Sequence, residues 1–223
     1  MEVRFLKIRA KLFFILKNPF WALKQLLVQY LPFFRFIRDT SHYQCYIDFD
    51  FWFNQKVLNR GGNRDVYWPV HPTSKVVGSS RIIVGVDAYP GIMGGCYIQG
   101  IGGVEIGDYT QVASNVIIVS ANHDVYDSRN HISAKVTIGK YCWLGGGSKI
   151  MPGVTLGDFT IVGAGAVVTS SFPEGHCIIA GVPAKKIKVL EIDKCIRYEL
   201  HPKYNGYISA RNFDFYRKKH LLV

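Results

Sequence analysis

Aliphatic side chains recur at every sixth position through the middle of the chain, with polar or small residues between them. A spacing of six fits neither an α-helix nor a simple strand, whose side chains repeat every 3.6 and every two residues. It fits a chain that forms a short strand, turns and repeats, so that three such units close one triangular coil. The pattern predicts an all-β solenoid whose axis is lined by Ile106, Val112, Ile118, Ile138, Leu144, Ile150, Leu156, Val162 and Val168.

The positions beside these aliphatic residues support the same coil. The residue that follows is usually small, because the backbone turns tightly there: Gly107, Ala113, Gly139, Gly145, Gly157 and Gly163. The residue two positions earlier is compact: Val104, Thr110, Val116, Val136, Cys142, Ser148, Val154, Thr160 and Ala166. Successive coils are expected to stack at the strand spacing of about 4.8 Å.

The repeat is interrupted once. Ile118 and Ile138 are 20 positions apart, which is not a multiple of six, and the residues between them are mostly polar. This segment is therefore expected to protrude from the solenoid as a loop, a place where functional residues often lie on a rigid scaffold. His123 lies at its start, close to the ordered coil, whereas His131 is expected to be a solvent-exposed loop residue.

Four segments carry a resemblance to a known family: Trp143-Leu-Gly-Gly-Gly, Ile150-Met-Pro-Gly-Val-Thr-Leu-Gly-Asp, Val162-Gly-Ala-Gly-Ala-Val-Val-Thr and Ala180-Gly-Val-Pro-Ala-Lys. Over about residues 70–190 the chain resembles the hexapeptide-repeat acyltransferases, in particular the sugar and polysaccharide O-acetyltransferases. The resemblance implies a left-handed parallel β-helix, a homotrimer, and acetyl-CoA as the acyl donor. The left hand comes from the resemblance alone, since the spacing does not determine it.

The resemblance also implies which residues act on the acceptor. Transfer of an acyl group to a hydroxyl needs a base, and imidazole is suited to that role near neutral pH. The family places its catalytic histidine on the protruding loop, where His123 lies. Asp124 is a candidate to orient the ring, although a backbone carbonyl would serve equally. Gln99 replaces an Asn found beside that histidine in related enzymes, and Tyr97 either lines the acceptor pocket or packs on the outer surface.

The family binds acyl-CoA in the groove between two adjacent prisms, so three sites are expected at three subunit interfaces. The positions that match are Trp143, Gly145, Gly146, Ala164, Thr169, Lys185 and Lys188. The chain departs from the family pattern at Gly146, where relatives often have Ser, and at Ser170, where they often have Lys. The two lysines would contact the phosphates of CoA or, alternatively, belong to a solvated basic tail, and Trp143 has packing as its alternative.

The N-terminal segment is apolar but contains too many charges and prolines for a transmembrane span or a secretory signal. It predicts two amphipathic helices, over residues 3–17 and 20–31, separated at Asn18-Pro19. Residues 1–38 hold eight basic side chains and one acid. That composition is typical of a helix lying on an anionic membrane surface, with packing on the domain or on another subunit as the alternative.

Charge and cysteine content add limits. The formal net charge is +11, but residues 71–170 are neutral, which argues against a nucleic-acid binder built around the core. The five cysteines form no short-range metal pattern, so no metal is expected, and they indicate reduced thiols in the cytoplasm, with the protein free or at the inner face of the membrane. The expected division is a helical segment over 1–70, the β-helix over 71–184, and a basic tail over 185–223, helical and covering one end of the prism.

These observations favour transfer of an acetyl group from acetyl-CoA to a sugar hydroxyl of a surface polysaccharide or its precursor. The transfer would be direct, in a ternary complex, with His123 as general base. Acetylation of a xenobiotic such as an antibiotic is the alternative on the same scaffold. A non-catalytic β-helix is less favoured, and so is a zinc hydratase, because His71, His123 and His131 lack the close pair such a site needs.

Overall fold

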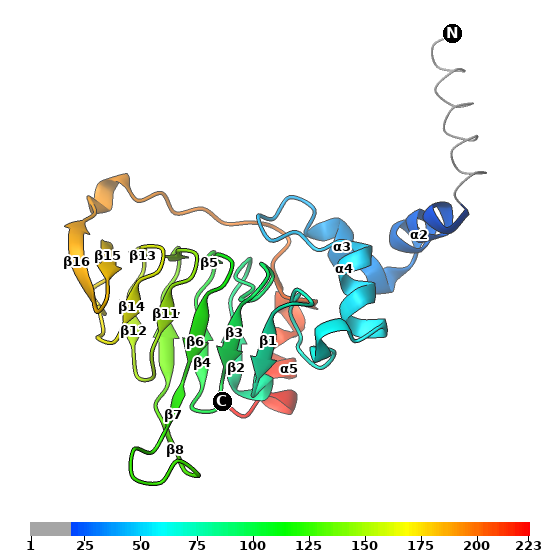
Figure 1. Cartoon of the computed structure of the whole chain (residues 1–223). Helices are drawn as coiled ribbons and strands as arrows, with labels where there is room; N and C mark the ends of the chain where they lie inside the picture. The colour runs from blue at the N-terminus through cyan, green and yellow to red at the C-terminus, as the bar shows by residue number, and fades with distance from the viewer. Residues whose placement is uncertain (1–18) are drawn as a thin grey trace.

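Three sheets form the faces of a triangular prism in the computed structural model, which describes residues 19–223 (Figure 1). Sheet A has the strand order β1-β3-β6-β11-β14, sheet B the order β2-β4-β9-β12, and sheet C the order β5-β10-β13-β15-β16. Neighbouring strands are parallel except for β16, which returns antiparallel to β15. The fold is the predicted left-handed parallel β-helix.

The strands are short, because the chain turns at each corner of the prism. Sheet A contains β1 (Lys75–Val77), β3 (Tyr97–Gln99), β6 (Ile117–Val119), β11 (Lys149–Ile150) and β14 (Val167–Val168). Sheet B contains β2 (Ile82–Val84), β4 (Val104–Ile106), β9 (Val136–Ile138) and β12 (Thr155–Leu156). Sheet C contains β5 (Gln111–Val112), β10 (Trp143–Leu144), β13 (Thr160–Val162), β15 (Cys177–Gly181) and β16 (Ala184–Val189).

The core of the prism is the predicted one. All nine aliphatic side chains of the six-residue repeat are buried, and the most accessible of them, Val112, is 6% exposed. The compact residues two positions earlier also face inward, and the two threonines among them find partners, whereas the buried Ser148 hydroxyl has none among the described residues. Thr110 Oγ1, for example, donates to the carbonyl of Gly139 at 2.7 Å and accepts from the Cys142 N–H at 3.0 Å.

Stacking of the coils explains the small residue after each aliphatic position. A Cβ atom added to Gly139 would lie 2.6 Å from the backbone nitrogen of Asp158 in the next coil. A Cβ atom added to Gly107 would lie 2.7 Å from the carbonyl carbon of Gly139. Since the neighbouring atoms are backbone, they cannot move aside without breaking the stack.

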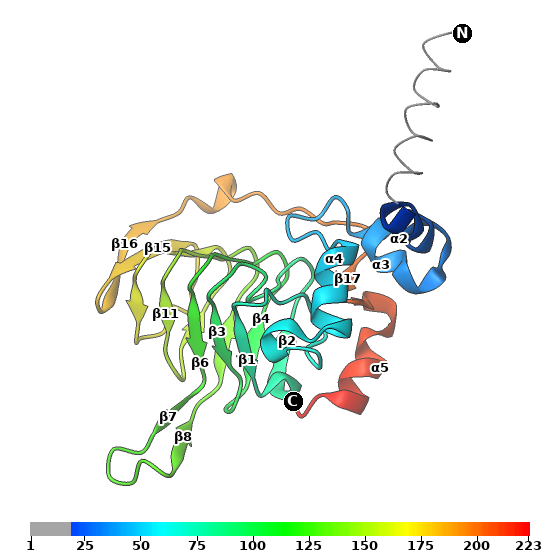
Figure 2. The same cartoon turned by 45° about the vertical axis from the view of Figure 1, so that its right-hand side comes forward.

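Helices precede the prism and gather at the end where its first coil begins (Figure 2). They are α2 (Pro19–Tyr30), a 3-10 turn (Pro32–Phe34), α3 (Arg35–Asp39), α4 (Phe49–Trp52), a π-helical turn (Phe53–Val57) and a 3-10 turn (Arg60–Gly62). The helix predicted over 20–31 is confirmed as α2, whereas the one predicted over 3–17 lies outside the described residues. Phe34, Phe36 and Ile37 are buried, but α2 has no buried residue.

The C-terminal tail returns along the prism to the same end (Figure 1). After β16 it forms a 3-10 turn (Ile192–Lys194), an extended segment, the hairpin β17 (Tyr204–Asn205) and β18 (Ile208–Ser209), and helix α5 (Ala210–His220). Phe213 and Tyr216 of α5 pack with ring centres 5.6 and 5.3 Å from that of Tyr67, which precedes the first strand. The tail predicted over 185–223 is therefore helical only over α5, which packs at the start of the prism, and its first residues, 185–189, belong instead to β16 of sheet C.

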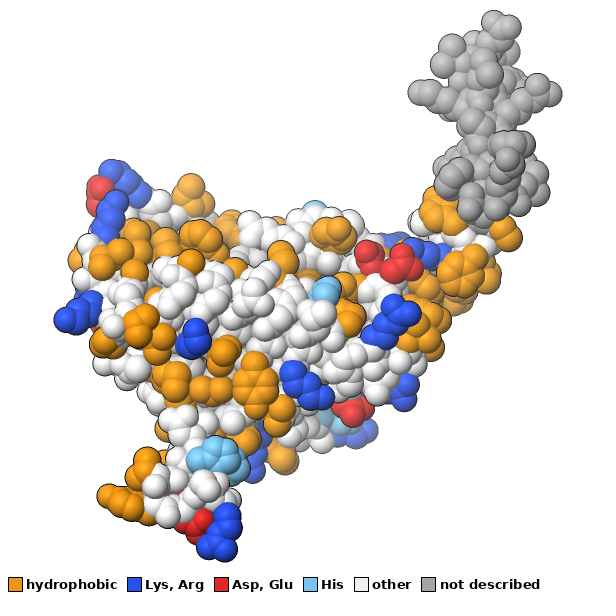
Figure 3. Space-filling model, in the orientation of Figure 1, with side chains coloured by type: hydrophobic (Ala, Val, Ile, Leu, Met, Phe, Trp, Pro, Cys, Tyr) orange, Lys and Arg blue, Asp and Glu red, His pale blue; other side chains and the backbone are white. Residues whose placement is uncertain are grey.

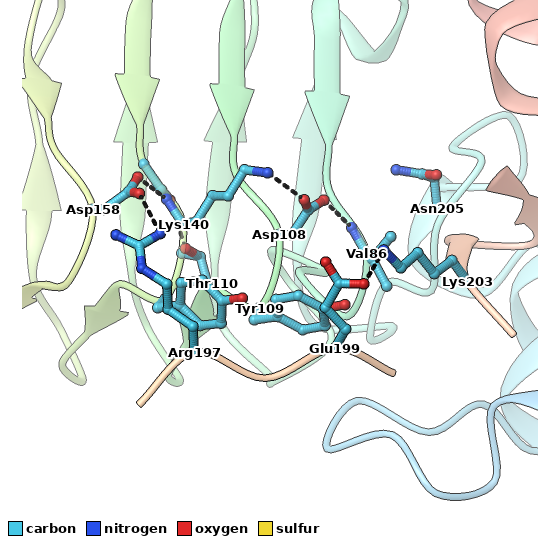
Figure 4. A network of polar contacts seen from close by, with 12 residues as sticks. Val86, Asp108, Tyr109, Thr110, Lys140, Asp158, Arg197, Glu199, Lys203 and Asn205 are labelled. Atoms are coloured by element: carbon cyan, nitrogen blue, oxygen red, sulfur yellow. Dashed lines mark hydrogen bonds and ion pairs between the residues drawn. The ribbon is translucent and has the colours of Figure 1, made fainter. Parts of the chain in front are cut away.

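The returning segment, residues 191–203, which we call the strap, lies on a ladder of aromatic side chains. Tyr109, Tyr141 and Phe159 occupy the same corner of successive coils, with ring centres 5.2 and 4.8 Å apart. Tyr141 donates from its hydroxyl to the carbonyl of Tyr198 at 2.8 Å, and the guanidinium of Arg197 lies 5.1 Å from the ring centre of Phe159. Ion pairs run beside the ladder, including Lys140 with Asp108 at 2.9 Å and Arg197 with Asp158 at 3.5 Å (Figure 4).

Candidate active site

The interruption of the repeat is a β-hairpin that extends away from the prism (Figure 1). Strands β7 (Ala121–His123) and β8 (His131–Ser133) pair antiparallel, with His123 opposite His131. The coil closes beneath the hairpin, where the Ala134 N–H donates to the carbonyl of Ser120 at 2.8 Å. The predicted protruding loop is confirmed, and its strand pairing holds the base of the hairpin in a fixed position.

His123 ends the outgoing strand, and its ring is exposed to solvent. Its Nδ1 atom lies 2.5 Å from the carbonyl oxygen of Ser128. A carbonyl oxygen can only accept, so this contact assigns the proton to Nδ1 and leaves a lone pair on Nε2. The ring of His131 packs beside it, with centres 4.5 Å apart. An imidazole held in this tautomer can accept a proton at Nε2.

The other charged residues of the hairpin stabilise its turn. The Asp124 carboxylate accepts from the N–H groups of Tyr126 at 2.7 Å and Asp127 at 3.3 Å. Asp127 pairs with Arg129 at 2.8 Å, and this hydrogen bond lowers the pKa of the Asp127 carboxyl. Of the two partners considered for the His123 ring, the backbone carbonyl is therefore the one in contact with Nδ1, while the Asp124 carboxylate lies in the turn.

Gln99 and Tyr97 lie on β3 in sheet A, one coil before the hairpin. Gln99 is 9% exposed, and its Oε1 accepts from the Ala121 N–H at 2.9 Å, directly at the base of β7. Among the described residues its Nε2 group has no hydrogen-bond acceptor. Tyr97 is 38% exposed and pairs in register with Lys75 and Ile117. The structure thus brings Gln99 to the His123 hairpin and leaves Tyr97 accessible on the outer face of the sheet.

Several candidate donor residues lie at the corner of the prism where sheet C turns into sheet A, at the end of the sheet A strands opposite to the hairpin. Gly146 and Ala164 occupy this corner in successive coils, joined by a hydrogen bond from the Gly165 N–H to the Gly146 carbonyl at 2.9 Å. Gly145 lies beside them, and Trp143 precedes them on β10 with 54% of its side chain exposed. Thr169 lies at the other end of the sheet A strands, directly after β14.

Lys185 and Lys188 lie on β16, at the outer edge of sheet C. Both are exposed, and neither forms an ion pair within the part of the chain that the structure describes. The intervening Lys186 differs, because it pairs with Glu174. Two cations on this strand are therefore available for an anionic ligand.

Sequence reasoning missed one component beside Trp143. The aromatic ladder and the strap enclose a cavity of about 570 Å³, lined by Tyr109, Tyr141, Trp143, Phe159, Ile196 and Tyr198 among others. The sequence contained a signal for this ladder, because Tyr141 and Phe159 each lie two residues after the glycine at the same corner, Gly139 and Gly157. The 14 extra residues of the hairpin displaced Tyr109 from that register.

Four of the five cysteines, all of which lie in the described residues, are buried and unsuited to act as nucleophiles, whereas Cys195 of the strap is partly exposed. Burial raises the pKa of Cys45 to about 12 and that of Cys142 to about 11, and Cys96 and Cys177 are buried as well. Buried neutral thiols are inert. Across residues 19–223, no cluster of three or more His, Cys, Asp or Glu side chains is arranged to hold a metal ion, and no helix has the length and apolar character needed to span a membrane.

Comparison with known proteins adds a family and relatives. The family model "Bacterial transferase hexapeptide (six repeats)" matches residues 135–170. The chain is 39% identical over 105 residues to a putative lipopolysaccharide biosynthesis O-acetyl transferase, WbbJ, of Escherichia coli, covering 41% of this chain and 53% of that protein. It is 37% identical over 89 residues to the galactoside O-acetyltransferase of the same organism, covering 38% and 43%. The chain thus spans about half the length of the curated relatives it matches.

A solved structure supports the fold. A galactoside acetyltransferase in complex with coenzyme A superposes with a TM-score of 0.50 and 24% identity, over 70% of this chain and 86% of that one. At this level of identity the likeness concerns the β-helix itself.

Proposed function

The chain belongs to the family of bacterial hexapeptide-repeat transferases, and on that premise we propose that it transfers an acetyl group from acetyl-CoA to a sugar hydroxyl. The observation that carries the proposal is the contact between His123 Nδ1 and the Ser128 carbonyl at 2.5 Å. This contact leaves Nε2 as a proton acceptor on a hairpin that the coil holds at its base. The relatives named as a galactoside O-acetyltransferase and a putative lipopolysaccharide biosynthesis O-acetyl transferase support a carbohydrate acceptor.

His123 acts as the general base. Its Nε2 takes the hydroxyl proton while the sugar oxygen forms a bond to the thioester carbonyl carbon. The C–S bond then breaks, and the imidazolium returns the proton to the departing thiolate, giving the acetate ester and free coenzyme A. No covalent enzyme intermediate is needed. The Nε2 group of Gln99, whose Oε1 accepts from the N–H at the base of the hairpin, would hydrogen-bond the acceptor.

The donor fits the corner that carries Gly146 and Ala164. A Cβ atom added to Gly146 would meet nothing nearer than the Ser114 carbonyl at 3.6 Å, so the surface there is open to an extended ligand. The exposed ring of Trp143 offers apolar contact, and Lys185 and Lys188 are free to pair with phosphates. Thr169 would bind the donor from the far edge of sheet A.

Two copies of the chain are needed to complete this site. In one chain, His123 and the corner residues lie at opposite ends of the sheet A strands, which have two or three residues, and a three-residue strand spans about 10 Å. A neighbouring prism packed beside the hairpin would bring a second corner to the same histidine. We therefore place the site between subunits of a homotrimer.

The acceptor is proposed to be a surface polysaccharide or its precursor, acetylated next to the membrane. Exposed apolar side chains on α2, including Phe20, Leu23 and Leu26, support contact with an anionic lipid surface. This contact complements the excess of basic residues in the first 38 positions.

Substitution of His123 tests the proposal. His123→Ala should lower the rate of coenzyme A release, measured with a thiol reagent and a panel of nucleotide sugars and oligosaccharides, by about 10²- to 10⁴-fold. The fold should survive because the side chain is exposed, which circular dichroism would verify. His42→Ala, also an exposed histidine, is the matched control and should keep the wild-type rate. A His123→Ala protein that retains most of the activity would exclude the proposed base.

A further inference from the structure

Two adjoining cavities lie at the end of the prism, between the N-terminal helices and the C-terminal hairpin with α5. Their volumes are about 720 and 420 Å³. Phe33, Phe36, Tyr207 and Ile208 line both, so the two cavities share a wall. They lie outside the candidate active site and have no part in the proposed acetyl transfer.

The smaller cavity is aromatic. Its walls are Phe33, Phe36, Trp52, Lys56, Tyr67, Tyr207, Ile208 and Tyr216. Tyr207 is fixed in place because its hydroxyl donates to Oε1 of the buried Gln55 at 2.7 Å. A cavity lined mainly by aromatic side chains is suited to an apolar chain.

Lys56 is the one charged group in that aromatic wall. Its ammonium donates to the carbonyls of Arg64 and Val66 at 2.6 Å each and lies 5.1 Å from the Tyr207 ring centre. Within residues 19–223, no carboxylate lies at ion-pair distance from it. Burial lowers the pKa of Lys56 to about 8. The cavity therefore holds a partly desolvated cation that forms no ion pair among the described residues, although the negative charge of Asp65 acts on it and raises its pKa.

The larger cavity has a mixed lining, in which apolar side chains accompany more basic than acidic groups. Its ionisable lining is Arg35, Asp39, His201, Lys203 and Arg211. Arg35 pairs with Asp39 at 3.1 Å, and Lys203 pairs with Glu199 at 2.8 Å. Arg211 has no carboxylate partner among the described residues. A guanidinium with free donors at the mouth of a cavity is suited to a phosphate.

An exposed apolar surface leads to this mouth. Leu23 and Leu26 of α2 are 53% and 55% exposed, and Phe33, which lines both cavities, is 64% exposed. Arg38 joins α2 to α3 by donating to the carbonyls of Val28 and Leu31. Hydrophobic side chains gather over this part of the molecule (Figure 3). The surface and the paired cavities together have the polarity of an amphiphile with an anionic head.

We infer that the two cavities form a binding site for a phosphate-bearing lipid, with its apolar chain in the aromatic cavity and its phosphate at Arg211. The inference goes beyond the proposed acetyl transfer and does not depend on it. It explains why an aromatic cavity adjoins a cavity lined by Arg211, which has no carboxylate partner among the described residues. A lipid held there would keep the protein at a membrane surface.

Decyl phosphate below its micellar concentration is the probe, with binding to the full chain measured by isothermal titration calorimetry. Wild type should bind it saturably, and Arg211→Glu and Phe33→Ser should each raise the Kd about tenfold or more. The matched controls Lys218→Glu and Phe215→Ser change exposed residues of α5 outside both cavities and should leave the Kd unchanged. Failure of wild type to bind, or equal Kd values in all variants, would overturn the inference.

Two further probes separate the contributions of chain and phosphate. Decyl maltoside has the same tail without the charge, and inorganic phosphate has the charge without the tail, so each should bind at least tenfold more weakly than decyl phosphate. If either binds as tightly, the paired site is wrong. Phe33→Ser should also keep the wild-type rate of acetyl transfer to a soluble sugar, and His123→Ala should keep the wild-type Kd for decyl phosphate. This pair of results distinguishes failure of the lipid site from failure of the proposed function.

Discussion

Adjacent glycines at the candidate donor corner have different physical origins. A Cβ atom on Gly145 would lie 2.6 Å from the Val162 carbonyl oxygen and 2.7 Å from the Ala164 nitrogen, both in the next coil. A Cβ atom on Gly146 would make only an ordinary contact. Stacking therefore demands glycine at the first position, whereas the open surface at the second is available to a ligand.

This difference predicts opposite outcomes for the two alanine variants. Gly145→Ala should lower the free energy of unfolding by about 1–3 kcal/mol, because the added methyl group must displace backbone. Gly146→Ala should be neutral or stabilising by up to about 1 kcal/mol, because alanine restricts the unfolded chain. Urea denaturation of both proteins checks the pair. Equal midpoints for the two variants would contradict the distinction.

Single residues could be predicted where the repeat fixed their direction, and less well elsewhere. The spacing of six gave the inward position of Ile118 or Leu144, because every coil repeats the same three corners. The partner of the His123 ring could not be chosen from the sequence, since a turn carbonyl such as that of Ser128 has no signature in residue type. The ring contact with His131 was missed for the same reason, because it depends on the register of the hairpin.

At the scale of elements, the strap is the feature that the sequence did not reveal. Residues 191–203 show no periodicity, and their position comes from contacts with a ladder far away in the chain. The Leu200 N–H donates to the Tyr109 hydroxyl at 3.1 Å, and Tyr198 lies with its ring centre 4.8 Å from that of Tyr109. Similarly, the interruption was predicted only as a loop. The pairing of β7 with β8 could not be predicted, because it depends on turn hydrogen bonds that have no signature in a polar sequence.

Removal of the Arg197 guanidinium should loosen the strap without unfolding the prism. Arg197→Ala removes the contact with Phe159 and the ion pair with Asp158. A cation–π contact of this kind contributes about 0.5–1 kcal/mol, so strap amides should exchange about two- to five-fold faster. Hydrogen–deuterium exchange read by mass spectrometry would measure this, with the exposed Arg129→Ala in the hairpin as control. Unchanged exchange over residues 197–200 would mean that the ladder does not hold the strap.

At the scale of the whole molecule, the prism separates the proposed base, His123, from the proposed donor corner at Gly146 and Ala164. The parallel stack was predictable from the repeat because each coil has the same pattern of inward aliphatic residues and small corner residues. The spatial relation between the hairpin and the donor corner was not, because it depends on which corner each segment occupies. The hairpin begins at one end of the sheet A strands, and the Gly146 and Ala164 corner lies at the other end. An intersubunit site follows from this separation together with the proposed reaction.

Subunit mixing tests that arrangement directly. His123→Ala lacks the base, and Ala164→Trp fills the exposed donor corner, so each homotrimer should be inactive. If each site takes its histidine from one subunit and its corner from the next, a randomly assembled equal mixture contains one site in four with both parts intact. Co-refolded mixtures should therefore recover about a quarter of the wild-type rate, whereas a site contained in one chain would recover none. Mixing two His123→Ala preparations carrying different tags is the control and should stay inactive, and light scattering should give three times the chain mass for every sample.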